Sequence, residues 1–305
     1  MTDLKIEKWK KAITFFIISS IIVSILIFLQ LIVFSDTKGI AGKETALLNS
    51  KYEDKLCEII LRFESSQIIL YKADNLWWGK SFINNEYVTF PLNQQKIASF
   101  IKSLSSIRKV YHISDNVLLY KDYKLDENGF FVEARDDSKA ILLDLCFGIQ
   151  NYNGAKISFR TGKSTSIYET ESDLSIFLYT DTHRWSDMLL LPKETAFFEE
   201  TEVLQCSIDN LPIFTESRAE LESFLYKLKT YRGSLVLAPN KSNLFDNSHI
   251  ILIETPKKVI RLFISKNETN DNYTVQAEIN GKSQNYALEI SQWTFNNLFT
   301  ITTKM

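Results

Sequence analysis

Residues 58–71 read EIILRFESSQIILY, and this stretch holds two short hydrophobic runs separated by a pair of serines. In the first run, Ile59, Leu61 and Phe63 alternate with Glu58, Arg62 and Glu64. Successive side chains of a strand point to opposite faces, so a period of two indicates a strand with one buried face. The stretch therefore predicts two antiparallel strands, which form a sheet that is covered on one side only.

The same period returns near the C-terminus. Tyr273, Val275 and Ala277 alternate with polar residues, and the run ends at Asn280-Gly281. Asn-Gly is the strongest short signal for a two-residue hairpin turn, because both residues tolerate positive φ. A strand followed by a tight turn is predicted here.

Two segments show helical spacing. The first runs from about Asn93 to Ile107 and the second from about Ser217 to Thr230, where Ser217 and Glu220 match a capping box. The apolar residues of the two segments match at a constant offset of 124; they are Ile97, Phe100, Ile101 and Leu104 in the first segment and Leu221, Phe224, Leu225 and Leu228 in the second.

A second constant offset links the segments that follow the two helices. An offset of 119 maps the apolar run Ile141 to Leu145 onto Ile260 to Ile264, and Gly162 to Ser164 onto Gly281 to Ser283. The agreement of helix, strand and turn predicts a tandem duplication. The units are residues 51–192 and 193–305, and each helix is expected to cover the apolar face of its own sheet.

Ala12 to Phe34 is a run of 23 residues without a charge, and 18 of them are hydrophobic. A helix of this length spans a hydrocarbon core of about 30 Å, which predicts a single transmembrane helix. Lysines before the run place residues 1–11 in the cytoplasm and the bulk of the chain outside, after a tether at residues 35–50. A cleaved signal peptide and a buried core helix are the competing interpretations.

The fold class that follows is α+β: an N-terminal transmembrane helix and two tandem, mixed or antiparallel sheet-plus-helix repeats. The chain has 305 residues, with 35 basic and 37 acidic side chains, so its charge gives no reason to expect a nucleic-acid partner. Cys57, Cys146 and Cys206 lie far apart and lack metal-ligand spacing. They could form one disulfide bond or remain buried thiols.

Candidate chemistry is sparse. Gly162-Lys163-Ser164 matches the end of a phosphate-binding loop, but the required earlier glycine is replaced by Ile157, so a hairpin turn is the better interpretation. The three histidines, His112, His183 and His249, have no partner at zinc-site spacing. The sequence therefore predicts no catalytic, cofactor-binding or metal-binding residues, no cofactor and no enzymatic activity.

Trp77-Trp78 is the one pair singled out as a possible interaction surface. Neighbouring residues of a strand face opposite sides, so one indole is expected in the core and the other at an exposed site or interface. An exposed indole could stack on a sugar or contact a partner protein, although a structural role is favoured for both.

The order of several motifs resembles a family of single-span envelope proteins known as domain of unknown function 4340. The matching features are a strand pair leading to Trp78, a Pro-Leu-Asn entry at Pro91 to Asn93, a helix ending at Ser103 to Ile107, a connector at Tyr123 to Asp126, a strand ending at Gly148, Ser158 to Arg160, and a closing segment from Arg184 to Leu190. Members of this family are associated with gliding-motility-type ABC-2 transporters.

The resemblance implies a membrane-anchored, extracytoplasmic accessory subunit of an ABC-2-type exporter, which would bind or scaffold beside a permease and an ATPase at the cytoplasmic membrane. The alternative is an envelope ligand-binding module for a glycan, lipid or solute that acts independently of a transporter. That alternative predicts a concave aromatic site that involves Trp77 or Trp78.

Overall fold

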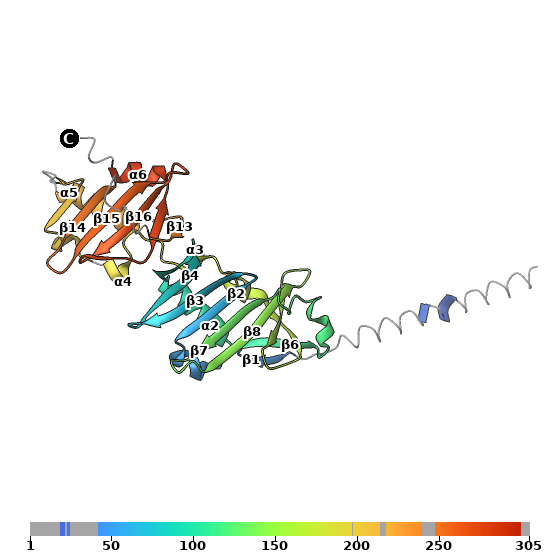
Figure 1. The fold of residues 1–305 in the computed structure, drawn as a ribbon. Helices are drawn as coiled ribbons and strands as arrows, with labels where there is room; N and C mark the ends of the chain where they lie inside the picture. The colour runs from blue at the N-terminus through green and yellow to red at the C-terminus, as the bar shows by residue number, and fades with distance from the viewer. Residues whose placement is uncertain are drawn as a thin grey trace, which may run out of the picture.

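The computed structural model shows two large antiparallel sheets that lie end to end (Figure 1). The structure describes residues 19–21, 23–24, 42–196, 198–213, 218–239 and 248–299. Strands make up 42% of it and helices 25%. Sheets, and not helices, thus determine the architecture.

The first sheet has ten strands in the order β1-β6-β10-β9-β8-β7-β2-β3-β4-β5, and all neighbours are antiparallel. The strands are β1 (Lys43–Thr45), β2 (Glu58–Phe63), β3 (Ser66–Ala73), β4 (Leu76–Ile83), β5 (Glu86–Pro91), β6 (Arg108–Ser114), β7 (Phe130–Arg135), β8 (Ile141–Gln150), β9 (Lys156–Thr161) and β10 (Ile167–Glu171).

Alternation and tight turns explain the first part of this sheet. Ile59, Leu61, Ile68 and Leu70 are all 0% exposed, as expected for one face of the β2–β3 hairpin. Burial of each such side chain contributes about 1.5–3 kcal/mol. The next two hairpins are closed by Asp74-Asn75 and Asn84-Asn85, whose four φ angles are positive, which is the geometry of a type I′ turn.

The helix expected near residues 93–107 is confirmed as α2 (Gln94–Ser105). Asn93 caps it, because its Oδ1 accepts the backbone N–H of Lys96 at 3.0 Å. Ile97, Phe100 and Leu104 are buried against the sheet. The shorter helices of this unit are η1 (Ser50–Lys55), η2 (Val117–Tyr120), η3 (Ser172–Phe177) and α3 (Thr182–Trp185).

The second sheet has eight strands, seven of which follow the order β12-β11-β14-β15-β16-β18-β13, while β17 pairs with β16. Its elements are β11 (Gln205–Ile208), β12 (Leu211–Pro212), β13 (Leu235–Leu237), β14 (His249–Glu254), β15 (Val259–Lys266), β16 (Tyr273–Ile279), β17 (Lys282–Ser283) and β18 (Ala287–Ile290), with helices α4 (Lys193–Ala196), η4 (Glu200–Glu202), α5 (Arg218–Thr230) and α6 (Gln292–Phe299).

The expected second helix is α5, which buries Phe224, Leu225 and Leu228, while Ser217 of the predicted capping box lies outside the described residues. The predicted hairpin turn is confirmed at Asn280-Gly281, where φ is +52° and +76°.

The two sheets share one strand order. The hairpin β2–β3 precedes α2 in the first unit, with β4 and β5 between them, and the pair β11–β12 precedes α5 in the second. In both units the strand after the helix lies beside the last strand of the sheet. The series β6-β10-β9-β8-β7-β2-β3 of the first sheet corresponds to β13-β18-β16-β15-β14-β11-β12 of the second. The first sheet carries β4 and β5 in addition at one edge. At its other edge it gains β1, which lies within the expected tether at residues 35–50.

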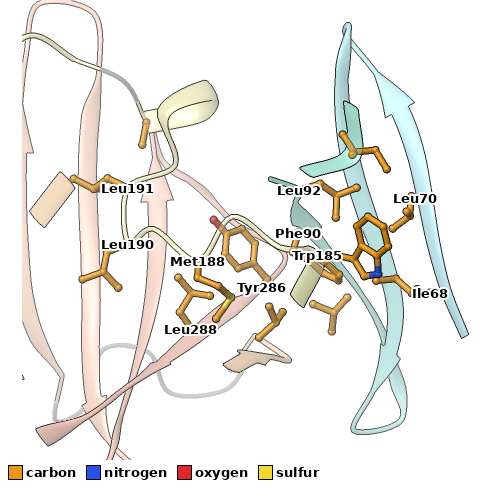
Figure 2. Packing of buried hydrophobic residues seen from close by; sticks show 14 of the residues in the cluster. Ile68, Leu70, Phe90, Leu92, Trp185, Met188, Leu190, Leu191, Tyr286 and Leu288 are labelled. Atoms are coloured by element: carbon orange, nitrogen blue, oxygen red, sulfur yellow. The ribbon is translucent and has the colours of Figure 1, made fainter. Parts of the chain in front are cut away.

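One segment, from Trp185 to Leu191, joins the sheets (Figure 2). The Trp185 carbonyl accepts the N–H of Asn93 at 2.9 Å in the first unit, and the Tyr231 carbonyl accepts the N–H of Leu190 at 3.1 Å in the second. Figure 2 shows Trp185 among side chains of the first sheet and Leu190 beside the second. The backbone of this segment therefore hydrogen-bonds to both units.

The expected α+β fold class with an N-terminal transmembrane helix needs correction. The structure is mainly β, because alternating runs pair into continuous ladders and the long helices α2 and α5 only cover them. Among the described residues, no helix has the length and hydrophobicity needed to cross a membrane. The expected span, Ala12 to Phe34, lies outside the described residues except for 19–21 and 23–24.

Candidate ligand-binding cavity

A cavity of about 660 Å³ lies on the first sheet at the β1 side. Its lining comes from five strands, β1, β6, β8, β9 and β10, from Ala46 and Leu47, which follow β1, and from Gly162 and Lys163, which follow β9. Leu48 then donates its N–H to the carbonyl of Leu104 at the end of α2, at 2.9 Å. This hydrogen bond fixes the chain that follows β1 at one wall of the space, which we call the first-sheet cavity.

The inner part of the first-sheet cavity is apolar. Leu143, Leu145 and Phe159 are at most 6% exposed and line it together with Val110 and Tyr168. Register pairs Phe159 with Tyr168, and their rings stack with centroids 5.5 Å apart. Alternation along β8 turns Leu143 and Leu145 to this face, while Asp144 between them contributes both to this lining and to a second pocket on the sheet. The volume lies within the range of about 300–1,000 Å³ that is typical of small-molecule sites.

Polar side chains surround the mouth of the cavity. Lys43, His112 and Lys163 are solvent-exposed members of the lining, and Thr45 and Thr161 add two half-buried hydroxyls. Lys43 and Lys163 form no ion pair with any residue in the part of the chain that the structure describes. Two ammonium groups are therefore available to an anionic ligand.

His112 has an acidic partner of its own. Its Nε2 lies 2.9 Å from Oδ1 of Asp115, and Ser166 donates a hydrogen bond to the same oxygen. The hydrogen bonds from Ser166 and His112 lower the pKa of the Asp115 carboxyl. This carboxylate therefore stays ionised at neutral pH beside the imidazole of His112. The cavity lining also includes the carboxylate residue Asp144, so Lys43 and Lys163 together leave the lining with a net positive charge.

The arrangement is suited to binding. Within the described chain, no hydroxyl or thiol hydrogen-bonds to His112, so the nucleophile–base contact of acyl-transfer sites is not formed there. An apolar interior with a cationic mouth instead matches a ligand with an apolar body and one anionic group.

The structure places the two tryptophans of the possible interaction surface differently. Trp77 packs against the hydrophobic core, and its backbone N–H donates to Oε1 of Gln94 at 3.0 Å. Trp78 is half-buried and lines a separate cleft of about 430 Å³ between the two sheets. Neither indole lies in the first-sheet cavity.

The other singled-out residues do not come together. His249 lies beside Asp209, with Nδ1 and Oδ2 2.7 Å apart, in the second unit, and His183 lies in α3. Among the described residues, no group of three or more His, Cys, Asp or Glu side chains could hold a metal ion. Gly162-Lys163 forms a turn after β9, and both residues line the first-sheet cavity.

All three cysteines are free thiols. Cys146 and Cys206 are buried, whereas Cys57 is half-buried. Burial raises the pKa of Cys146 to about 11 and that of Cys206 to about 12. Neither buried thiol is therefore activated as a nucleophile.

The first-sheet cavity could not be predicted from the sequence. Its lining residues look like ordinary members of alternating strands, and only the pairing of β1, β6 and β10 with β9 and β8 assembles them. The one local signal was Gly162-Lys163, a turn that carries an exposed cation next to apolar strands.

Comparisons with known proteins add little to this geometry. No family model matches the chain, and no solved structure matches it. The chain is 24% identical over 147 residues to an uncharacterized protein of Treponema pallidum (strain Nichols). That match covers 46% of this chain and 45% of the relative, so the chain spans less than half of the relative's length. The resemblance to domain of unknown function 4340, the exporter partners and the envelope location stay predictions.

Proposed function

We propose that the protein is a non-catalytic binding protein whose first-sheet cavity holds an amphipathic molecule with an apolar chain and an anionic head group. The observation that carries this proposal is an apolar space of about 660 Å³ with two unpaired lysines among its exposed lining residues. This proposal takes up the ligand-binding alternative drawn from the sequence, but its cavity does not include Trp77 or Trp78.

The two parts of the ligand follow from two parts of the cavity. Phe159, Leu143 and Leu145 offer an apolar surface, and transfer of an alkyl chain onto it contributes about 0.8 kcal/mol per buried CH₂. Lys43 and Lys163 favour an anion over a cation at the mouth, each by roughly 0.2–1 kcal/mol, since both are exposed to solvent and screened by salt. Hydrophobic burial supplies the affinity, and the lysines select the head group.

Calorimetric titration of the full chain with decanoate, and with decyltrimethylammonium as the matched cation, tests this function. We expect decanoate to bind and the cation to bind more weakly. Ala46→Trp places an indole in the cavity wall and should abolish decanoate binding, whereas Ala155→Trp, in an exposed turn, should not. Decanoate binding by Ala46→Trp with the wild-type affinity would contradict the assignment of the cavity.

The head-group selection has its own test. The double variant Lys43→Gln/Lys163→Gln should raise the decanoate Kd by about two- to thirtyfold, which follows from the two exposed charges. Lys72→Gln is the matched control, because Lys72 lies on β3, toward the β5 edge of the same sheet and away from the cavity. If the double variant and the control bind decanoate equally well, the lysines do not select the ligand.

The accessory role in an ABC-2-type exporter rests on the sequence resemblance alone. Purification of the tagged chain from its native source tests it, with mass spectrometry of the co-purifying proteins. Recovery of the chain without a permease or an ATPase would count against that role and would leave the binding function untouched.

A further inference from the structure

A second concave site lies between the two sheets. It is the cleft of about 430 Å³ that Trp78 lines, and we call it the inter-sheet cleft. One wall comes from β4 and β5, at the edge of the first sheet that faces the second sheet (Figure 1). The other wall comes from the end of β16, from β17 and from the two residues that follow it. The site thus exists only when both units are present.

Trp78 forms the aromatic part of the first wall. Its neighbour Gly79 is buried under Phe90, and alternation along β4 therefore turns Trp78 to the opposite, outer face. Thr89 of β5 also lines the cleft. It is half-buried and pairs with Lys80 of β4. The indole N–H of Trp78 donates to no residue of the described chain. A flat apolar ring with an available donor thus faces the cleft.

The second wall presents polar side chains on a fixed backbone. The N–H of Gln284 donates to the carbonyl of Ala277 at 2.8 Å, and the N–H of Val259 donates to Oδ1 of Asn280 at 2.8 Å. Tyr286, two residues after Gln284, is buried and lies in the seam between the units (Figure 2). This wall is held in place before any ligand arrives, which reduces the entropic cost of binding.

The polar side chains of this wall are available. Ser283, Gln284 and Asn285 line the cleft, and their side chains hydrogen-bond to nothing in the ranges that the structure describes. Each amide offers an N–H donor and a carbonyl acceptor side by side. Lys282 is the one charged residue of the lining, and the lining contains no carboxylate.

We propose that the inter-sheet cleft binds oligosaccharides that carry acetamido groups. An indole face stacks on the C–H surface of a sugar ring, and this contact needs no charge on the ligand. An acetamido group offers a donor and an acceptor at the spacing of a side-chain amide, so Gln284 and Asn285 can each pair with one. A single lysine is too little positive charge to hold a nucleic acid.

Calorimetric titration of the full chain with chitotriose, beside maltotriose as a trimer without acetamido groups, tests the proposal. We expect chitotriose to bind, and Trp78→Ala to weaken this binding by at least about tenfold. Trp293→Ala, which removes an indole that is 68% exposed on α6, is the matched control and should change nothing. No heat with chitotriose at about 5 mM, or equal affinity for maltotriose, would overturn the proposal.

Asn285→Ala keeps the proposal testable if Trp78→Ala destabilises the fold, because Asn285 is exposed and its side chain has no partner in the described chain. It should weaken chitotriose binding by about three- to tenfold, and unchanged affinity would overturn the assignment of the amide wall. Decanoate titration of both variants distinguishes this site from the first-sheet cavity, since loss of chitotriose binding alone is the expected result.

Discussion

Trp185 connects the core of the first unit with the segment that crosses to the second, and its replacement tests how this connection is stabilised. The indole is 0% exposed and its ring centroid lies 5.2 Å from Tyr179 and 5.3 Å from Phe100. Its Nε1–H donates to the carbonyl of Tyr179 at 3.0 Å, and its own carbonyl accepts the N–H of Asn93. Both the side chain and the backbone of Trp185 therefore hold the start of the connecting segment against the first unit.

The size of the effect follows from these contacts. Trp185→Ala removes a fully buried aromatic side chain, which costs about 3–5 kcal/mol, and leaves the Tyr179 carbonyl without its donor, for about 1–3 kcal/mol more. A total of about 4–8 kcal/mol is comparable to the whole stability of many domains. Trp185→Phe keeps most of the apolar volume and loses the donor, so we expect about 2 kcal/mol.

Urea unfolding followed by far-ultraviolet circular dichroism measures both variants. We expect a lower midpoint with an unchanged slope for Trp185→Phe and a largely unfolded chain for Trp185→Ala. Trp293→Ala is the control for loss of an indole as such, and it should cost less than about 1 kcal/mol, since that ring is 68% exposed. A loss in Trp185→Phe no larger than in the control would refute the reasoning.

Three further substitutions have predictable effects on urea unfolding. Burial raises the pKa of Cys146 to about 11, so the unfolded thiol ionises first as the pH rises above about 8.5. The free energy of unfolding therefore falls between about pH 9 and 11, and this fall should be about 1–2 kcal/mol smaller in Cys146→Ala; an identical fall would show that Cys146 plays no part. A Cβ at Gly148 would lie 1.9 Å from the carbonyl oxygen of Tyr123, so Gly148→Ala should cost about 1–3 kcal/mol, and a neutral result would contradict this packing. Asn93→Ala removes the cap of α2 and should cost about 1 kcal/mol, whereas Asn93→Ser should not; equal losses would rule out capping as the cause.

The elements that could be predicted from sequence are those whose stabilising contacts lie close in the chain. The hairpin at residues 58–71 exposes one face to solvent, so polar and apolar residues alternate in its sequence. The strands β2 and β3 form where this alternation predicts them. The helix after Asn93 buries the residues that its spacing indicated. Asn280-Gly281 adopts the positive φ angles that its residue types allow.

The expected balance of helix and sheet was wrong for a physical reason. Alternation identifies a strand, but it does not show how many strands one sheet will collect. β2 pairs on one side with β3, its neighbour in sequence, and on the other with β7, so that Ile60 lies opposite Glu133. Distant pairings of this kind join ten strands into one sheet, and α2 covers only part of its face.

Neither candidate site could be predicted from the sequence, because both depend on long-range pairing between strands. Alternation fixes the face to which Trp78 or Leu145 points, but long-range pairing decides what lies opposite. The predicted turn at Asn280-Gly281 illustrates this, because its local geometry was foreseeable while its place in the wall opposite Trp78 depends on the seam between the units. The sites also lie far apart in the strand order, since the first-sheet cavity uses β1, β6 and β8 to β10, the inter-sheet cleft uses β4 and β5, and β7, β2 and β3 separate them. A ligand in one site therefore touches no residue that lines the other, and each can be tested without disturbing its neighbour.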